Sequence, residues 1–259
     1  MNSAFQLNGK LIWVVGGAGY LGQAVVTLLS NLGAKLLCID MENRAVDFVR
    51  NAGLEDKVAT ASFNINDTGF IARFVKEQLA LHGSPDGLVN LAFGSTAKKL
   101  EELADEDFDK VNHAALTATF MLAREVAYNM IEKGRGSIVL FSSMYGMVSP
   151  DDEVYEAPMN KNPLEYGVGK AGIIQMTKYL AVHWAKQHVR VNCISPGPFP
   201  SPTVQQNHPG FIARLAKKSP MGRIGMSDEI AGPVAFLLSD VSSYITGHNL
   251  VVDGGWTSW

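Results

Sequence analysis

Tyr166 and Lys170 are the side chains whose types and spacing best suit acid–base chemistry. They are four residues apart in the stretch Tyr166-Gly167-Val168-Gly169-Lys170. Residues four apart on a helix share one face, so the phenol and the ammonium can reach the same pocket. A phenol titrates near pH 10, and a nearby cation favours its ionised form. The pair therefore predicts a proton donor and acceptor that works near neutral pH.

A glycine-rich loop near the start of the chain supplies a second feature. The apolar run from Leu11 to Val15 leads directly into Gly16-Gly17-Ala18-Gly19-Tyr20-Leu21-Gly22, and an amphipathic helical pattern then continues to Gly33. A second apolar strand follows from Lys35 to Asp40. Glycines allow a tight turn and a close approach to a pyrophosphate, which the amide end of the next helix can bind. This strand–helix–strand unit predicts dinucleotide binding.

Asp40 favours NAD over NADP. It lies 18 residues beyond Gly22, where this kind of fold carries an acid that binds the ribose hydroxyls and repels a 2′-phosphate. No Lys or Arg occurs from Leu11 to Ala34, so nothing nearby would neutralise that phosphate. Arg44 is the exception to this argument, because one helical turn further on it can reach towards the ribose.

The rest of the chain alternates strands and helices. Strands are expected at residues 58–65, 88–93 and 137–141, and helices at residues 43–52, 68–82 and 105–133. This alternation predicts an α/β fold, a doubly wound parallel sheet of the Rossmann type, with the ligand at the carboxyl ends of the strands. The 259 residues are expected to form one domain.

Composition narrows the function to small-molecule chemistry. A net charge of −3 gives no footprint for nucleic acid or anionic lipid. Cys38 and Cys193 lie in apolar runs without metal-ligand spacing and are interpreted as reduced core residues, so no metal site is expected. No stretch approaches a membrane span, and the chain start lacks the pattern of a secretory signal. We expect a soluble, cytoplasmic protein with no nucleic-acid or membrane partner.

With Ser143, Tyr166 and Lys170 in order behind a nucleotide-binding start, the sequence resembles the short-chain dehydrogenase/reductase family along nearly its whole length. Val111-Asn112 and the closing run Val251-Val252-Asp253-Gly254-Gly255 carry the same resemblance. It implies that Tyr166 is the catalytic acid and base, that Lys170 lowers its pKa and holds the ribose, and that Ser143 binds the reacting oxygen. It also implies that Asn112 supports a proton relay, and that the protein is a homotetramer of the common short type.

The resemblance also suggests which residues contact the cofactor and substrate. Ser201 stands where a Thr usually contacts the nicotinamide amide. The predicted cofactor-binding residues are Gly16, Gly19, Tyr20, Leu21, Asp40, Asn64, Ile65, Asn90, Ala92, Tyr166, Lys170, Pro196, Gly197, Phe199 and Ser201. The predicted substrate contacts are Ser143, Tyr155, Asn160 and Asn162, and substrate loops are expected at about residues 144–165 and 196–220.

Three departures from the family pattern stand out. The glycines are spaced Gly-x-x-Gly-x-x-Gly, with Tyr20 where the common short enzymes have Gly, as in the longer sugar-nucleotide epimerase branch. The family's Asn-Asn-Ala-Gly is replaced by Asn90-Leu91-Ala92-Phe93, which puts apolar residues at a polar and a small position. Finally, 22 residues separate Ser143 from Tyr166, more than in the common short enzymes, and this insert is either a surface excursion or a substrate lid.

These features predict reversible hydride transfer between NAD and a secondary alcohol or ketone. The acidic insert carries Tyr and Asn side chains that can accept hydrogen bonds from substrate hydroxyl groups. A sugar, sugar acid or polyol is therefore the preferred substrate class. A 3-oxoacyl-thioester reductase is the alternative enzyme, although no basic cluster for an acidic carrier protein stands out. A non-catalytic NAD-sensing regulator is the alternative from another class, and the complete set of predicted catalytic residues argues against it.

Overall fold

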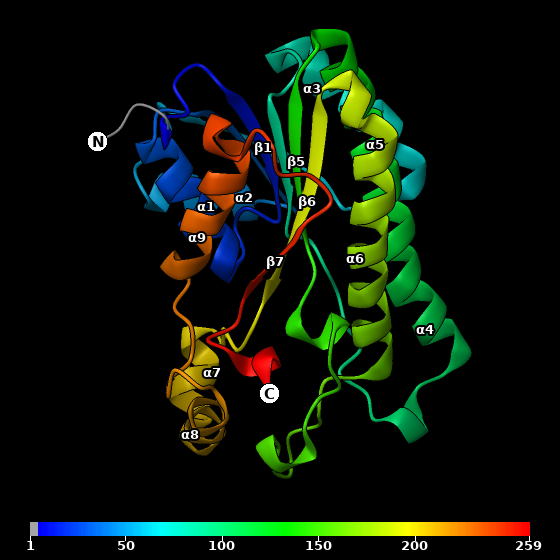
Figure 1. Cartoon of the computed structure of the whole chain (residues 1–259), viewed down its shortest axis with the longest axis vertical. Helices are drawn as coiled ribbons and strands as arrows, with labels where there is room; N and C mark the ends of the chain where they lie inside the picture. Colours follow the sequence, from blue (N-terminus) through cyan, green and yellow to red (C-terminus); the bar gives the residue numbers. More distant parts are fainter. Residues whose placement is uncertain (1–4) are drawn as a thin grey trace.

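The computed structural model describes residues 5–259 and has a central sheet with helices on both faces (Figure 1). Within these residues, seven parallel strands form one sheet in the order β3-β2-β1-β4-β5-β6-β7. The strands are β1 (Leu11–Val15), β2 (Lys35–Asp40), β3 (Val58–Ser62), β4 (Gly87–Asn90), β5 (Gly136–Phe141), β6 (Val189–Pro196) and β7 (Asn249–Val252).

The central strands are apolar runs because both of their faces are covered. Every residue of β4 is buried, as are the last four of β1 and the last five of β5. Parallel strands read as continuous hydrophobic runs for this reason. The predicted doubly wound parallel sheet is confirmed.

Helices form the two outer layers. The helices are α1 (Tyr20–Asn31), α2 (Arg44–Asn51), α3 (Ile71–His82), α4 (Asp105–Asn112), α5 (Ala118–Lys133), α6 (Leu164–Trp184), α7 (Pro202–Asn207), α8 (Pro209–Lys218) and α9 (Asp228–Leu238). In Figure 1, α1 and α9 cover one face of the sheet and α5 and α6 the other. A hydrophobic core lies on each side, one including Trp13 and Leu122, the other Ile12 and Leu29.

The strand order changes direction between β1 and β4. From β1 the chain moves outward to β2 and β3, and it then returns to place β4 on the other side of β1. In open α/β sheets, ligands bind outside the carboxyl ends of the strands at such a switch point. The glycine loop after β1 and the irregular segment Leu91–Lys99 after β4 both lie there.

The predicted continuous helix at residues 105–133 is interrupted. The segment His113–Thr117 winds as a π-helix between α4 and α5. It packs against α6, where a side chain on Gly169 would meet Asn112 and Ala115. The change in helical winding thus occurs where this segment contacts α6. The local sequence alone does not indicate that contact.

The C-terminal segment folds back onto its own chain. Trp256 is buried in a cluster with Met144, Tyr145, Val154 and Leu215. Trp256 is therefore not available for a contact with another subunit, whereas the Trp259 side chain is 77% exposed. Of the helices within residues 5–259, none combines the length and apolar character that crossing a bilayer requires.

Candidate active site

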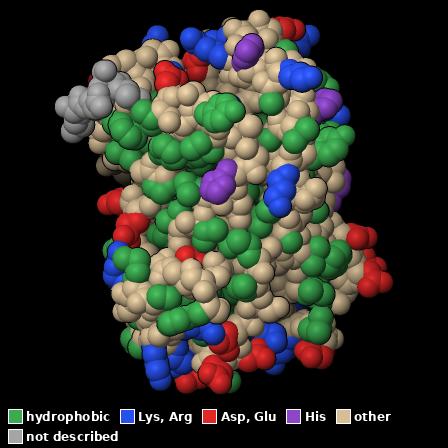
Figure 2. Space-filling model, viewed as in Figure 1, with side chains coloured by type: hydrophobic (Ala, Val, Ile, Leu, Met, Phe, Trp, Pro, Cys, Tyr) green, Lys and Arg blue, Asp and Glu red, His purple; other side chains and the backbone are tan. Residues whose placement is uncertain are grey.

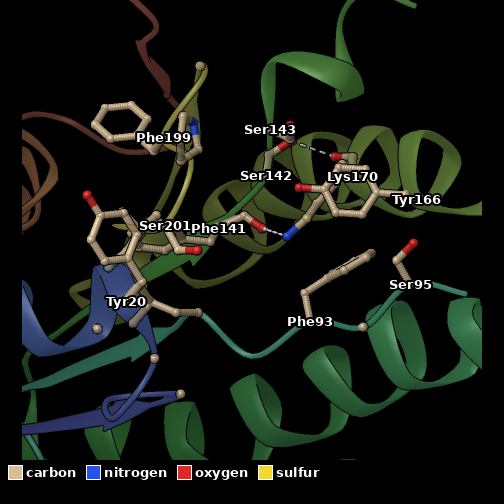
Figure 3. Close-up of a pocket in the computed structure, with 18 residues that line it drawn as sticks. Tyr20, Phe93, Ser95, Phe141, Ser142, Ser143, Tyr166, Lys170, Phe199 and Ser201 are labelled. Atoms are coloured by element: carbon tan, nitrogen blue, oxygen red, sulfur yellow. Dashed lines mark hydrogen bonds between the residues drawn. The ribbon is translucent and has the colours of Figure 1, made fainter. Parts of the chain in front are cut away.

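A cavity of about 460 Å³ opens at the carboxyl ends of β1, β4, β5 and β6. Figure 3 shows Tyr166 and Lys170 on α6, next to Phe141, Ser142 and Ser143 at the end of β5. The predicted site residues that line this cavity are Gly16, Gly19, Tyr20, Leu21, Ser143, Tyr166, Lys170, Pro196, Gly197, Phe199 and Ser201. The sheet topology thus gathers segments that are far apart in the sequence.

Lys170 is buried and makes a defined contact with the end of β5. Its Nζ donates to the carbonyl oxygen of Phe141 at 2.9 Å, and it lies 5.5 Å from the centroid of the Tyr166 ring. Burial lowers the pKa of Lys170 to about 7. An ammonium with few partners in a poorly hydrated pocket releases its proton more readily, because desolvation disfavours the charged form.

The phenol of Tyr166 differs from its expected behaviour. Burial raises the pKa of Tyr166, and a hydrogen bond with Ser143 acts in the opposite direction. The expected lowering of this pKa by Lys170 is not found in the protein alone, because desolvation of the phenol is the larger effect. The phenol of the free protein is therefore protonated at neutral pH.

Two serines fasten the end of β5 around this site. Ser142 Oγ donates to the carbonyl oxygen of Lys170 at 2.7 Å, which ties β5 to α6 (Figure 3). Ser143 Oγ accepts from the backbone N–H of Tyr145 at 3.1 Å. A serine hydroxyl can donate and accept at once, so Ser143 still has its proton to offer to the cavity.

The glycine loop is shaped for an anion. A Cβ on Gly22 would lie 2.2 Å from the carbonyl oxygen of Gly16, so the turn closes too tightly for any other residue. Gly19 caps α1 without a side-chain hydrogen bond, and the first turn of α1 carries no acid. Amides at a helix start therefore face the cavity without a competing negative charge, which fits a pyrophosphate.

A second cavity, of about 300 Å³, continues the first past the end of β2. Its lining includes the predicted contacts Asp40, Asn64, Ile65 and Ala92. The residues that line both cavities are Gly16, Gly19, Leu91, Phe93 and Gly94. An elongated molecule can therefore contact Asp40 at one end and Tyr166 at the other, as a dinucleotide would.

Asp40 is buried and its carboxylate is already engaged. Its Oδ2 accepts from the N–H of Ala18 at 3.0 Å, and its Oδ1 accepts from the N–H of Met41 at 2.9 Å. Arg44 Nη1 lies 3.1 Å from Oδ1, and its side chain is half exposed. The acid thus holds the glycine loop in place and also positions a cation beside the second cavity.

Two of the predicted catalytic and cofactor-binding residues lie outside both cavities. Asn90 accepts from the N–H of Ala92 at 3.1 Å and donates to Thr119 at 3.0 Å, so its side chain shapes the loop after β4. Asn112 Nδ2 donates to the carbonyl oxygen of Phe108 at 3.1 Å. Its Oδ1 is buried without a hydrogen-bond partner among the described residues, behind the helix that carries Tyr166.

The predicted substrate contacts separate into two groups. Ser143 lines the cavity of Tyr166, whereas Tyr155, Asn160 and Asn162 line a neighbouring cavity of about 790 Å³ formed by the insert. The Tyr155 hydroxyl lies 2.8 Å from that of Tyr145. Asn160 donates to the carbonyl oxygen of Ala97 at 3.1 Å. Of these three, Tyr155 is the one that packs against the same apolar cluster as Tyr166, the cluster around Trp256.

Sequence reasoning missed several residues of the site. Leu91, Phe93, Gly94, Ser95, Phe141 and Ser142 line the main cavity. Leu91 and Phe93 depart from the family pattern, but that departure alone does not indicate that their side chains line the cavity. Tyr145, whose N–H donates to Ser143, was also missed. Its place two residues after Ser143, close to the end of the strand, was the signal available in the sequence.

Comparisons with known proteins match nearly the whole chain. A family model described as enoyl-(acyl carrier protein) reductase matches residues 17–257. A 3-oxoacyl-[acyl-carrier-protein] reductase of Thermotoga maritima is 32% identical, over 96% of this chain and 98% of its own. An NAD-dependent glycerol dehydrogenase of Listeria innocua is 30% identical, over 98% of this chain and 96% of its own. The crystal structure of a short chain dehydrogenase from Leptospira borgpetersenii with bound NAD+ has a TM-score of 0.86 and is 33% identical, covering 99% of this chain and 96% of that one.

Proposed function

This chain belongs to the short-chain dehydrogenase/reductase family of oxidoreductases, and we propose that it transfers hydride reversibly between NAD and a secondary alcohol or ketone. One observation carries the proposal. Ser143, Tyr166 and Lys170 line a single cavity whose other wall is the glycine loop. A proton-transfer group and a dinucleotide cradle in one cavity are what such a reaction requires.

The residues around the crevice fit the dinucleotide. The glycine loop and the start of α1 would bind the pyrophosphate, Asp40 would lie at the adenosine end, and Ser201 at the nicotinamide end. When bound, the nicotinamide supplies the hydride chemistry. The protein contributes orientation, exclusion of water and the movement of one proton.

We assign each step of that proton movement to this chain's own residues. Tyr166 is the acid and base, with its hydroxyl directed at the substrate oxygen. Ser143 donates a hydrogen bond to the same oxygen, and Lys170 supplies the positive charge that favours ionised Tyr166. Asn112 is assigned to proton relay, for which its buried Oδ1 offers an acceptor that has no hydrogen-bond partner within residues 5–259.

The charge of the cavity favours an uncharged substrate. Among the described residues that line it, Lys170 is the one charged side chain, and its Nζ is engaged with Phe141. A sugar acid would need a cation for its carboxylate. Within the expected class of sugars, sugar acids and polyols, we therefore favour a neutral polyol or sugar.

A 3-oxoacyl-thioester reductase is the second candidate, favoured by the 32% identity to the Thermotoga maritima enzyme. A turnover assay that follows NADH absorbance separates the two. Neutral polyols, sugars, sugar acids and a 3-oxoacyl thioester form the panel, each tested in the appropriate direction. Turnover with the thioester alone would overturn the polyol assignment, and NADH binding without any turnover would support a sensing role.

The preference for NAD rests on Asp40, and its replacement by Ala provides a test. We expect the preference for NAD over NADP in kcat/KM to narrow about tenfold or more, because a charge-assisted ribose contact is lost and Arg44 is freed for the 2′-phosphate. The double variant Asp40→Ala/Arg44→Ala is the control and should lose the gain in NADP use. An unchanged ratio in Asp40→Ala would show that another residue selects the cofactor.

We assign the substrate walls to the two expected loops, residues 144–165 and 196–220. Arg214 on α8 joins them, donating to the carbonyl oxygen of Val154 at 2.7 Å and lying 2.7 Å from Glu156. Lys218 and Asp151 form a second ion pair between the same segments. Figure 2 shows basic and acidic side chains gathered at the lower end of the molecule, where Figure 1 places α8.

Replacing Arg214 by Ala is expected to raise the substrate KM about threefold to tenfold, because the two walls lose a charge-assisted contact. The dissociation constant of NADH should stay near the wild-type value, since the cofactor crevice is not touched. Arg73→Ala is the matched control, because Arg73 pairs with Glu77 on the surface of α3. Equal KM values for wild type and Arg214→Ala would mean that the insert is only a surface excursion.

We further propose a cytoplasmic homotetramer. The exposed apolar side chains Val168, Tyr179 and Val182 of α6, with Tyr128 of α5, support a subunit interface on this pair of helices. Both cysteines are free and buried, which suits a reducing compartment. Light scattering that gives a monomer mass at micromolar concentration would contradict the tetramer.

A further inference from the structure

Phe93 occupies the junction of the two cofactor cavities. It lines both of them, and it stands where the family pattern has a glycine. Figure 3 shows its ring pointing into the site beneath Tyr166 and Lys170. A large side chain at this position adds a wall that a glycine cannot supply.

The ring of Phe93 contacts both proposed catalytic side chains. The Nζ of Lys170 lies over its face, 3.8 Å from the centroid. The Tyr166 ring meets it edge to face, with centroids 4.9 Å apart and planes at 79°. The negative face of an aromatic ring attracts a cation, and a desolvated site strengthens that attraction.

Lys170 has few other partners. The carbonyl oxygen of Phe141 accepts one of its three N–H groups, and the Phe93 ring faces the ammonium as a second partner. A buried ammonium needs such compensation, because burial disfavours its charge. The ring and the carbonyl together fix where the ammonium lies.

The backbone on both sides of Phe93 is anchored. Asn90 holds the N–H of Ala92 at 3.1 Å. Glu165, fully buried next to Tyr166 in the sequence, accepts from the N–H of Thr96 at 3.1 Å and from its hydroxyl at 2.8 Å. The ring is therefore set in place by contacts from β4 and from α6.

We propose that Phe93 is a positioning residue whose ring holds the Lys170 ammonium against the Phe141 carbonyl before the dinucleotide binds. This inference rests on the role assigned to Lys170 in the proposed function. Phe93 is not assigned any contact with the reacting atoms. Its effect on the reaction passes through Lys170 and through the packing of Tyr166.

The test compares Phe93→Leu with Phe93→Tyr in the cofactor-free protein. Leu keeps most of the bulk that excludes water but has no π face, whereas Tyr keeps the ring. Trace labelling with acetic anhydride at a series of pH values, read by mass spectrometry, gives the midpoint at which Lys170 becomes a free amine. The exposed Lys186 in the same digest is the reference for reagent reactivity.

The wild-type midpoint should lie near pH 7, where burial sets the pKa of Lys170. In Phe93→Leu the midpoint should fall by about half a unit or more, since the charged form loses its π partner, and in Phe93→Tyr it should stay at the wild-type value. An unchanged or higher midpoint in Phe93→Leu would overturn the proposal. If Phe93→Leu does not fold, Phe93→Met takes its place with the same expectation.

NADH fluorescence titrations of the same proteins keep the two hypotheses apart. Wild-type protein that fails to bind NADH would contradict the proposed function, yet the labelling midpoints would still decide the role of Phe93. Conversely, normal NADH binding with equal labelling midpoints in all variants would reject the role of Phe93 alone.

Discussion

Replacement of Tyr166 by Phe is expected to lower kcat at least about 10²-fold while the fold and the affinity for NADH stay near wild type. The variant removes one oxygen, the atom to which we assign proton transfer. A phenylalanine ring keeps the edge-to-face contact with Phe93 and the packing against the apolar cluster around Trp256. The loss should therefore appear in turnover rather than in binding or stability.

Tyr244→Phe is the matched control, because Tyr244 is fully exposed and lies outside both cofactor cavities. Steady-state assays that follow NADH absorbance with the best substrate of the panel give kcat. Fluorescence titration gives the NADH dissociation constant. A Tyr166→Phe protein that keeps more than about a tenth of wild-type kcat would assign the proton to another group. Ser143, which lines the same cavity, would then be the next residue to replace.

The central sheet could be predicted because its strands are buried on both faces. The expected strands at residues 11–15 and 35–40 coincide with β1 and β2. The expected strand at residues 58–65 is shorter in the structure, since β3 ends at Ser62 at the edge of the sheet. Edge strands have one neighbour, so the apolar pattern that marks their ends is weaker.

The spatial grouping of the site followed from topology, whereas its detailed contacts did not. Parallel strands bring their carboxyl ends to one edge, which is why Ser143 and the glycine loop meet in one cavity. The segment Leu91–Lys99 has no regular structure, so no periodicity indicates where its side chains point. Its anchor is Glu165, 69 residues from Thr96, and a pairing of that range leaves no mark in the local sequence.

The same limit explains the pKa of the Tyr166 phenol. Helical spacing correctly placed Lys170 beside Tyr166, and a cation at that position does favour ionisation. The degree of burial depends on the whole surrounding fold, and in the free protein burial raises the pKa of Tyr166 and lowers that of Lys170. In the free protein, burial thus favours the uncharged form of both side chains.

Lys170→Met is expected to change the pH dependence of stability. Burial lowers the pKa of Lys170 to about 7, whereas in the unfolded chain it titrates near 10.5. Between these values the unfolded chain binds more protons, so the wild-type free energy of unfolding gains from this group as pH rises. From pH 6 to pH 8.5, the wild type should gain about 2 kcal/mol relative to Lys170→Met.

Urea unfolding of both proteins, at the same protein concentration and at pH 6, 7 and 8.5, measures this difference in the free energy of unfolding. Comparing the two proteins cancels groups that both contain and that do not interact with Lys170, such as Cys38, whose pKa burial raises to about 12. Cys193 does interact with Lys170, but burial raises its pKa to about 11, so it stays protonated over this pH range. A difference in unfolding free energy that stays constant over this range would contradict a lowered pKa at Lys170.

The same variant should be less active for the reason that makes it more stable at low pH. Met fills the pocket without a buried charge, so below pH 7 the folded state no longer bears the cost of desolvating an ammonium. Without that cation the ionised form of Tyr166 loses its electrostatic support, and the midpoint of activity against pH should move upwards. A pH–rate profile of Lys170→Met with an unchanged midpoint would show that Lys170 does not act on Tyr166, whatever its effect on stability.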